Sequence, residues 1–383
     1  MLRIGRIAFG TLAFALSANA VLAHAQSQVM TGSSMELGGE RLALSRDETS
    51  RLSELGQSLT ATPALQDRAL AAARAVVRSP DARHVLASYE LEIALRRHDD
   101  VMRAGALDVL IASRLTRPER IPSYVAARGE IAYRAHAYAL ASTLWTRAAE
   151  LQPNSPQALM NLAQVKAAQA DPTAASDLIR RAIALAGRGQ AVVPEVWYRQ
   201  WLSIAYNGHQ QAQTAAAGQA LLAAYPNAAN WRFALAAYRQ LLAAQPAAEI
   251  DMLRLMRGTQ TFNQSVEYQR LAQLLLRAGL PAEARDTLDD GIARGVVARD
   301  QSPIPEIGRE IARALAGQAP ARPTIALTAV AISDERLGRA AAFAMAGRRA
   351  EAEPLLRAVA ETGALDWDRD LARFWLLWLA RPA

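Results

Sequence analysis

The sequence contains two consecutive segments of 34 residues, from Pro122 to Gly189, that carry matching residues at matching places. Small residues occupy the 8th, 20th and 27th places of each segment, and a large apolar residue occupies the 24th. These residues are Gly129, Ala141, Ala148 and Trp145 in the first segment, and Ala163, Ala175, Ala182 and Ile179 in the second. Spacings of three and four residues indicate amphipathic helices, and a fixed period of this length indicates stacked units. The sequence therefore predicts a helical repeat architecture.

This pattern resembles the tetratricopeptide repeat family, in which small residues lie where two helices cross and large apolar residues pack against the next unit. The resemblance implies an all-α fold, namely a right-handed α-solenoid of antiparallel helix hairpins, and a protein-binding function. The first segment departs from the pattern at Arg128 and Ala132, where the family carries a leucine and an aromatic ring. The chain also resembles exported tetratricopeptide proteins of Gram-negative bacteria.

Weaker copies of the unit continue along the chain. We predict a third unit over 196–229, a helix pair from Trp231 with its second helix near 248–257, a clearer unit over 265–298, and a last unit from Ser333 followed by a helix over 366–380. Upstream, the spacing predicts helices over 64–78, 82–96 and 99–114, with a helix-joining turn at His98. Four prolines interrupt the rhythm between 300 and 332, although 306–316 keeps helical spacing. No segment alternates between apolar and polar residues, so a sheet is not expected.

The amino terminus has the order of a secretory signal peptide. Arg3 and Arg6 precede an apolar stretch over 7–20, and a small-x-small site ends at Ala25. We expect cleavage before Gln26, and an uncleaved membrane anchor is the alternative, although the apolar stretch is shorter than a span requires. The chain has no cysteine, which excludes disulfides and the lipid anchor of bacterial lipoproteins. The expected location is the periplasm or the medium of a Gram-negative bacterium.

The predicted layout follows from these features. It comprises a signal peptide (1–25), a flexible leader rich in glycine and serine (26–41), N-terminal helices with a degenerate repeat (42–121), core repeats (122–298), a proline-interrupted segment (299–332), and a C-terminal repeat with a closing helix (333–383). No stretch after the signal is long and apolar enough to span a bilayer.

Basic residues outnumber acidic ones, with 43 Lys and Arg against 36 Asp and Glu and a formal charge of +7. An excess of positive charge favours anionic partners. The arginines are interleaved with acids, however, as in Asp368-Arg369-Asp370, and this pattern favours solvated helix faces of mixed charge. We therefore expect no nucleic-acid partner, while an anionic envelope polymer stays open as an alternative.

The residue types needed for common chemistries are missing or badly spaced. No two histidines have the spacing of zinc ligands, and the single lysine, Lys166, does not lie in a phosphate-binding loop. There is no nucleophile elbow of the serine hydrolases. The close carboxylate pairs, such as Asp289 with Asp290, point in different directions on a helix. We therefore expect a non-enzymatic protein with no catalytic residue, no cofactor and no metal site, although a hydrolase that uses carboxylates stays a minor alternative.

The last predicted helix is rich in aromatic residues. A stripe at helical spacing contains Leu371, Phe374, Trp375, Trp378 and Leu379. This stripe favours a terminal helix that covers the open end of the array. The alternative is a hydrophobic surface that docks a partner or lies at a membrane interface.

The resemblance implies that a partner binds along the concave face, which the first helix of each unit lines. Projection of the family's non-core positions onto this chain gives Glu130, Tyr133, Arg134, Met160, Asn161, Gln164, Gln200, Asn207, Gln269, Gln273 and Arg277. A lining rich in amide groups suits hydrogen bonding to an extended backbone. One subtype of the family grips a terminal carboxylate, but Ala126 and Glu130 stand where it has a lysine and an asparagine.

The main hypothesis is an exported scaffold that binds an extended segment or a helix of another envelope or secreted protein. The alternative is an adaptor for an anionic envelope polymer or for polysaccharide-export machinery, with a peripheral membrane or polymer contact.

Overall fold

The computed structural model describes residues 28–31, 34–37, 40–189, 192–242, 246–317 and 334–381. The predicted signal peptide lies outside these residues. The chain divides into two compact units, Met1–Ala191 and Val192–Ala383. Both units are built from antiparallel helix hairpins, and the predicted all-α solenoid class is confirmed.

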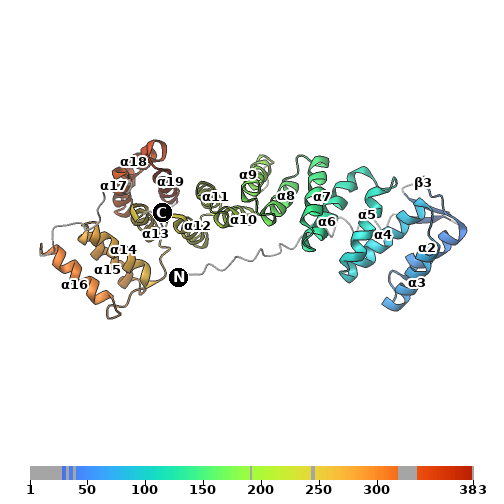
Figure 1. Ribbon diagram of the computed structural model, residues 1–383, viewed down its shortest axis with the longest axis horizontal. Helices are drawn as coiled ribbons and strands as arrows, with labels where there is room; N and C mark the ends of the chain where they lie inside the picture. Colours follow the sequence, from blue (N-terminus) through green and yellow to red (C-terminus); the bar gives the residue numbers. More distant parts are fainter. Residues whose placement is uncertain are drawn as a thin grey trace. The chain divides into compact units, whose positions relative to one another are not determined.

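In the first unit, each hairpin packs mainly within itself and against the next hairpin in the chain (Figure 1). Its helices are α2 (Arg46–Ser58), α3 (Pro63–Val76), α4 (Pro80–Arg97), α5 (Asp100–Ala112), α6 (Ile121–Arg134), α7 (Tyr138–Leu151), α8 (Pro156–Ala168) and α9 (Pro172–Arg188), with a short 3-10 turn η2 (Pro118–Arg120) before α6. The three helices predicted upstream of the core repeats are present as α3, α4 and α5.

The second unit begins in the same way. Its helices are α10 (Glu195–Asn207), α11 (Gln211–Ala224), α12 (Ala228–Leu242), α13 (Pro246–Gly258), α14 (Ser265–Arg277), α15 (Pro281–Ala293), α16 (Ile304–Leu315), α17 (Glu335–Met345), α18 (Arg349–Thr362) and α19 (Asp366–Leu379). The predicted helices over 248–257, 306–316 and 366–380 correspond to α13, α16 and α19.

Local sequence signals explain where the helices begin and turn. Ser79, Ser155 and Asp171 cap helices by accepting a hydrogen bond from a backbone N–H of the first turn. His98 has a left-handed backbone, with φ of 54°, at the end of α4, and the Asp99 side chain caps α5 directly after it. The cluster of His98 with Asp99 and Asp100 is therefore a turn between helices, as predicted.

The small residues of the repeat lie where the two helices of a hairpin cross. A Cβ atom on Gly129 of α6 would lie 2.5 Å from the indole of Trp145 of α7, which is too close for any side chain. The same indole donates a hydrogen bond from Nε1 to the carbonyl of Ala126 at 3.0 Å. Ala141, Trp145 and Ala132 form one buried cluster, so these residues serve as packing residues.

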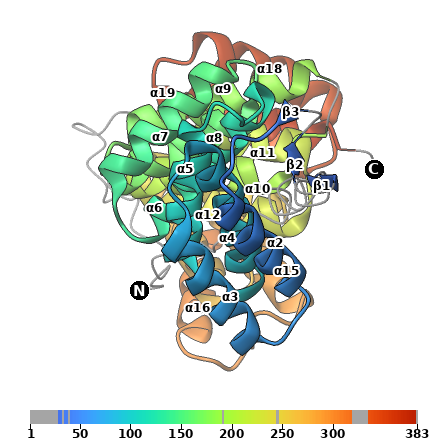
Figure 2. The same ribbon diagram turned by 90° about the vertical axis from the view of Figure 1, so that its right-hand side faces the viewer.

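The prediction that the chain contains no sheet is wrong, because a small antiparallel sheet precedes the helices. It consists of β1 (Gln28–Thr31), β2 (Ser34–Leu37) and β3 (Glu40–Arg41) in that order. The sheet falls in the segment that we expected to be a leader without regular structure. Figure 2 shows the three strands close together, ahead of α2 in the chain. Met35 and Leu42 are buried among apolar residues of α2 and α4, including Leu52 and Leu55 of α2. This burial stabilises the segment, although its strands are too short to show a period.

The last helix packs as the apolar stripe predicts, but in a different place. Leu371, Phe374 and Trp375 are fully buried and Leu379 is 9% exposed, whereas Trp378 is only half-buried. Instead of covering an open end, α19 lies against α11 and α13, which precede it by more than a hundred residues (Figure 1). Gly218 and Gly258 favour this contact, because a Cβ atom on either would lie only 3.2 Å from the ring of Phe374 or 3.1 Å from that of Trp375.

Candidate partner-binding surfaces

The predicted lining residues of α6 have unequal access to solvent. Arg134 is exposed and donates a hydrogen bond to Asp100 of α5 at 2.9 Å, and it lies 3.8 Å from Glu130. Glu130 is half-buried, and burial raises its pKa against the opposing effects of Arg103 and Arg134. Tyr133 packs its ring 5.4 Å from Trp145, so most of this side chain belongs to the hairpin core.

The lining prediction for α8 needs a correction. Met160 is 1% exposed and Asn161 is 4% exposed, so neither can reach a partner on an open face. The side-chain oxygen Oδ1 of Asn161 instead accepts a hydrogen bond from the side-chain amide of Gln157 at 2.9 Å. The resemblance places these residues on the variable face, but here α8 turns this side toward its neighbours. Gln164 remains half-buried, with part of its side chain accessible.

The predicted lining residues of the second unit are at least partly accessible to solvent. Asn207 and Arg277 are exposed at the ends of α10 and α14, and Gln200 and Gln273 are half-buried on the same helices. Gln269 is also half-buried and donates a hydrogen bond to the hydroxyl of Ser265 at 2.9 Å. Each of the two helices therefore presents polar groups that could donate to or accept from a partner backbone.

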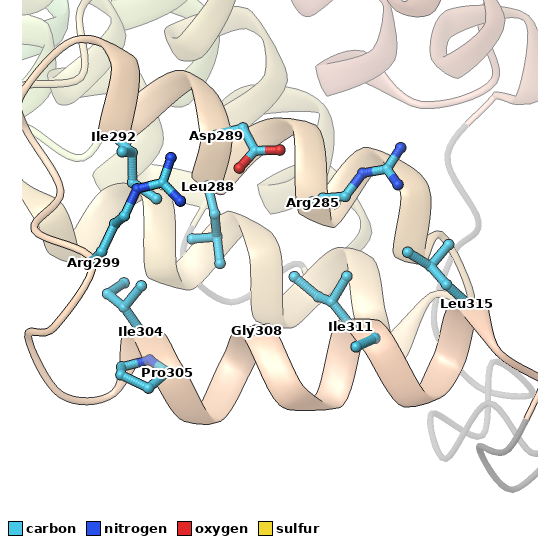
Figure 3. Close-up of a pocket in the computed structure, with 11 residues that line it drawn as sticks. Arg285, Leu288, Asp289, Ile292, Arg299, Ile304, Pro305, Gly308, Ile311 and Leu315 are labelled. Carbon is cyan, nitrogen blue, oxygen red and sulfur yellow. The ribbon is translucent and has the colours of Figure 1, made fainter.

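The second unit contains a hollow between α15 and α16, which we call the α15–α16 groove. Its volume is about 300 Å³. Figure 3 shows Leu288 of α15 and Ile304 and Ile311 of α16 in the space between the helices. Arg285 and Asp289 of α15 stand at the rim. The groove is apolar inside, with few charges around it.

A larger hollow, the α11–α19 groove, lies between α11, α18 and α19 and has a volume of about 650 Å³. Alanines of α11 and leucines of α19 form its apolar floor, and charged residues of α18 and α19 stand around them. The lining residues are Ala216, Gln219, Ala220, Ala223, Arg349, Glu353, Arg357, Arg373, Leu376, Leu377, Leu379 and Ala380. The sequence pattern gives no sign of this groove, because the groove combines residues that lie far apart in the chain.

The α18 charges around the α11–α19 groove are paired at the surface, whereas Arg373 of α19 pairs with the buried residue Asp370. Glu353 accepts a hydrogen bond from Arg357 at 2.7 Å, which lowers the pKa of this carboxyl group, and it lies 4.0 Å from Arg349. Arg373 donates to Asp370 at 3.3 Å. The two α18 arginines are more than half exposed. Exposed pairs of this kind contribute only about 0–1 kcal/mol each, so the guanidinium groups can exchange partners easily.

The described residues also bear on metal sites, membrane-spanning helices and unoccupied carboxylate pairs. They contain no group of histidines and carboxylates that could hold a metal ion, and none of their helices has the length and apolarity to cross a membrane. Two acids of closely spaced carboxylate pairs, Asp290 of Asp289–Asp290 and Glu351 of Glu351–Glu353, have arginine neighbours: Asp290 lies 3.5 Å from Arg257, and Glu351 pairs with Arg348. These acids act within ion pairs of the fold.

Comparisons with known proteins leave the family open. No protein-family model matches the chain, and no curated protein matches its sequence. Among solved structures, the apo form of the quorum sensor NprR from B. thuringiensis is similar at a TM-score of 0.24 and 13% identity, over 86% of this chain and 97% of that one. A TM-score this low carries no inference, so the description of the fold rests on this chain's own helices and contacts.

Proposed function

We propose that this protein is a non-enzymatic helical-repeat adaptor that is exported to the periplasm or the medium and binds another protein through the first helices of its hairpins. The observation that carries the proposal is that, within one hairpin, some residues pack the two helices together while others on the first helix stay exposed to solvent. In the α6–α7 hairpin, Gly129 and Trp145 hold the two helices together, while Arg134 on the first helix reaches solvent. Packing therefore fixes the backbone and leaves side chains of the first helix available.

Each unit presents polar side chains on its first helices, and such side chains suit a protein partner. The accessible residues are Arg134 and Gln164 in the first unit, and Gln200, Asn207, Gln273 and Arg277 in the second. Amides both donate and accept hydrogen bonds, as an extended backbone requires. Because helices hold these groups in place before binding, less conformational entropy is lost when the partner docks.

The alternative adaptor for an anionic polymer is less well supported. A polymer site needs arginines without local acids, but Arg134 pairs with Asp100 and Arg128 with Asp108, both at 2.9 Å. In the second unit, Arg254 pairs with Asp251 and Glu283 and is only 13% exposed. A large part of the positive charge is thus neutralised within the fold.

Site-specific crosslinking tests the proposal. A photoreactive amino acid placed at Gln164 or at Gln273 in the chain beginning at Gln26 should capture a protein from an extract of the source organism's envelope. The same amino acid at Arg180 serves as the control, because this residue is exposed on α9, a second helix, and forms only a local pair with Asp177. We expect a discrete protein adduct from each first-helix position and none from the control.

Charge reversal supplies the second arm of this test. Arg134→Glu should lower the yield of the Gln164 adduct about tenfold, since loss of a charge-assisted contact typically costs 1.5–3 kcal/mol. Equal adducts from Gln164 and Arg180, or an adduct unaffected by Arg134→Glu, would contradict the proposal. An adduct that disappears at high salt and contains polysaccharide instead of protein would favour the polymer adaptor.

A further inference from the structure

The α11–α19 groove combines an apolar floor with an arginine rim, and this combination favours a ligand that has both an apolar face and negative charge. Ala216, Ala220 and Ala223 lie at spacings of four and three along α11, so their small side chains form one shallow strip. Across from them, Leu376 and Leu377 of α19 remain half-buried, with apolar surface still open to solvent. The floor can therefore accept the apolar face of another element.

The rim carries a net positive charge. Arg349 and Arg357 on α18 and Arg373 on α19 line the groove together with a single acid, Glu353. Asp370 also pairs with Arg373, but it lies beside the groove and its second oxygen accepts a hydrogen bond from the buried hydroxyl of Tyr238 at 2.8 Å. The groove thus favours a ligand that brings negative charge.

The spacing of the arginines distinguishes between kinds of anion. Arg349 and Arg357 are eight residues apart on one helix, which corresponds to about 12 Å along its axis. The single carboxylate of a fatty acid could meet only one of them. A polypeptide can place carboxylates at both positions, with apolar side chains between them. The planar guanidinium group also favours bidentate pairing with carboxylates.

We propose that the α11–α19 groove is a docking site for an acidic amphipathic helix of a partner protein. The apolar face of that helix packs on the α11 alanines and on Leu376 and Leu377. Its Asp or Glu residues, which lie two turns apart, pair with Arg349 and Arg357. An amphipathic helix in an apolar groove is a common mode of peptide recognition.

This site is independent of the first-helix face. Its residues lie on α11, α18 and α19, whereas the proposed adaptor face uses α6, α8, α10 and α14. Variants in the groove should therefore leave the crosslinks at Gln164 and Gln273 unchanged. Failure of one proposal does not imply failure of the other.

The experiment uses two labelled synthetic peptides and the chain from Gln26 onward. One peptide carries leucines at helical spacing and glutamates two turns apart, and the other has glutamine at every glutamate position. Fluorescence anisotropy should show that the acidic peptide binds at least about tenfold more tightly than the glutamine peptide at low salt. Equal binding of the two peptides, or no binding of the acidic one, overturns the proposal.

Variants then locate the binding. The double variant Arg349→Glu/Arg357→Glu should weaken the acidic peptide at least about tenfold. Arg309→Glu is the matched control, because Arg309 is an exposed arginine on α16 with one local partner, Glu306, at 3.3 Å. Ala216→Gln should also weaken binding, since it fills the floor at an exposed position without adding charge. A loss of the same size in Arg309→Glu, or no loss in the groove variants, contradicts the proposed location.

A competition arm tests the lipid alternative. Laurate below its micellar concentration offers one carboxylate and an alkyl chain. If laurate displaces the acidic peptide more effectively than unlabelled peptide does, the groove is a site for a lipid anion and the proposal is wrong. Circular dichroism and thermal unfolding of each variant confirm that a loss of binding does not come from loss of the fold.

Discussion

At the scale of single residues, the turns inside the hairpins show the clearest strain. His136, Ala170 and His209 hold left-handed backbones, with φ of 58°, 61° and 53°, between the first and second helices of their hairpins. Gly279 and Gly347 occupy the same turn in later hairpins, with φ of 75° in both. A residue with a Cβ atom costs about 1–2 kcal/mol in this conformation, whereas glycine does not. The hairpins therefore tolerate a local cost that glycine would remove.

Replacement of Ala170 by glycine should raise the free energy of unfolding of the first unit by about 1 kcal/mol. Urea unfolding followed by circular dichroism measures this change. Gly347→Ala is the reciprocal control: no atom lies within 4 Å of the added methyl group, so any destabilisation comes from the backbone alone. Unchanged or lower stability in Ala170→Gly would contradict the assignment of strain to this turn.

Glu48 is a buried carboxylate that holds two helix starts together. It is 4% exposed and accepts hydrogen bonds from the backbone N–H groups of Ser45, Arg78 and Ser79, each at 2.8 Å. Burial raises the pKa of this carboxyl group, but the hydrogen bonds from Ser79, Ser45 and Arg78 outweigh it and lower the pKa from 4.5 to about 2. The ionised form therefore stabilises the junction of α2 with α4.

The depressed pKa fixes the direction of a pH effect. The stabilisation from Glu48 is fully present above pH 4.5 and is lost as the pH falls toward about 2, because the folded carboxylate resists protonation. Glu48→Gln should lower the free energy of unfolding by about 3 kcal/mol at neutral pH and reduce the acid sensitivity. Glu54→Gln is the control, since Glu54 lies exposed on the same helix and contacts only local side chains, namely Arg51 at 2.7 Å and the Ser50 hydroxyl at 3.4 Å. Equal acid profiles for Glu48→Gln and the original chain would count against this role.

At the scale of elements, the crossing of α6 and α7 depends on one missing side chain. Trp145 fills the space above Gly129, and its Nε1 atom is held by the carbonyl of Ala126. The sequence indicated both residues as packing positions, because they recur at the 8th and 24th places of the repeat. The structure adds the distance that makes glycine necessary.

Two glycine-to-alanine variants should have opposite effects. Gly129→Ala places a methyl group 2.5 Å from the indole and should destabilise the first unit by about 1–3 kcal/mol. Gly105→Ala lies in α5, where nothing approaches within 4 Å, and should stabilise the helix by about 0.5–1 kcal/mol. Thermal unfolding of both variants tests the pair. Similar shifts in the same direction would show that helix propensity, and not the crossing, controls this position.

At the scale of the whole molecule, coupling should stay within each compact unit. In repeat proteins each element contacts mainly its neighbours, so a local change spreads through adjacent helices. The second unit adds a long-range link, because α19 packs on α11 and α13 and Tyr238 of α12 donates to Asp370 of α19. Helices far apart in the sequence therefore share one core in this unit.

Hydrogen exchange can measure the extent of that core. Trp375→Ala removes a fully buried ring and should destabilise its surroundings by about 3–5 kcal/mol. We expect faster amide exchange in α11–α13 and α17–α19, while α2–α9 of the first unit keep their rates. Trp378→Ala is the control, since this side chain is only half-buried. Faster exchange throughout both units would show that the chain is a single cooperative body.

The sequence by itself determined the elements and their internal packing. A period along one chain reports which residues face inward, so the helices of the core repeats could be read from spacing. The resemblance to the tetratricopeptide pattern then indicated the crossing at Gly129 and the packing role of Trp145. The turn at His98 was also local, because it depends on residues that follow one another directly.

Only the tertiary structure decided which elements meet. Strands β1, β2 and β3 were missed because such short strands show no period, and the burial of Met35 stabilises them. Met160 was assigned to the open face, but it is buried, since the orientation of α8 depends on its neighbours. The place of α19 and its groove depends on contacts with distant helices, including the packing of Phe374 and Trp375 over Gly218 and Gly258. Shape complementarity between distant residues leaves no mark on a local period, so these features required the folded chain.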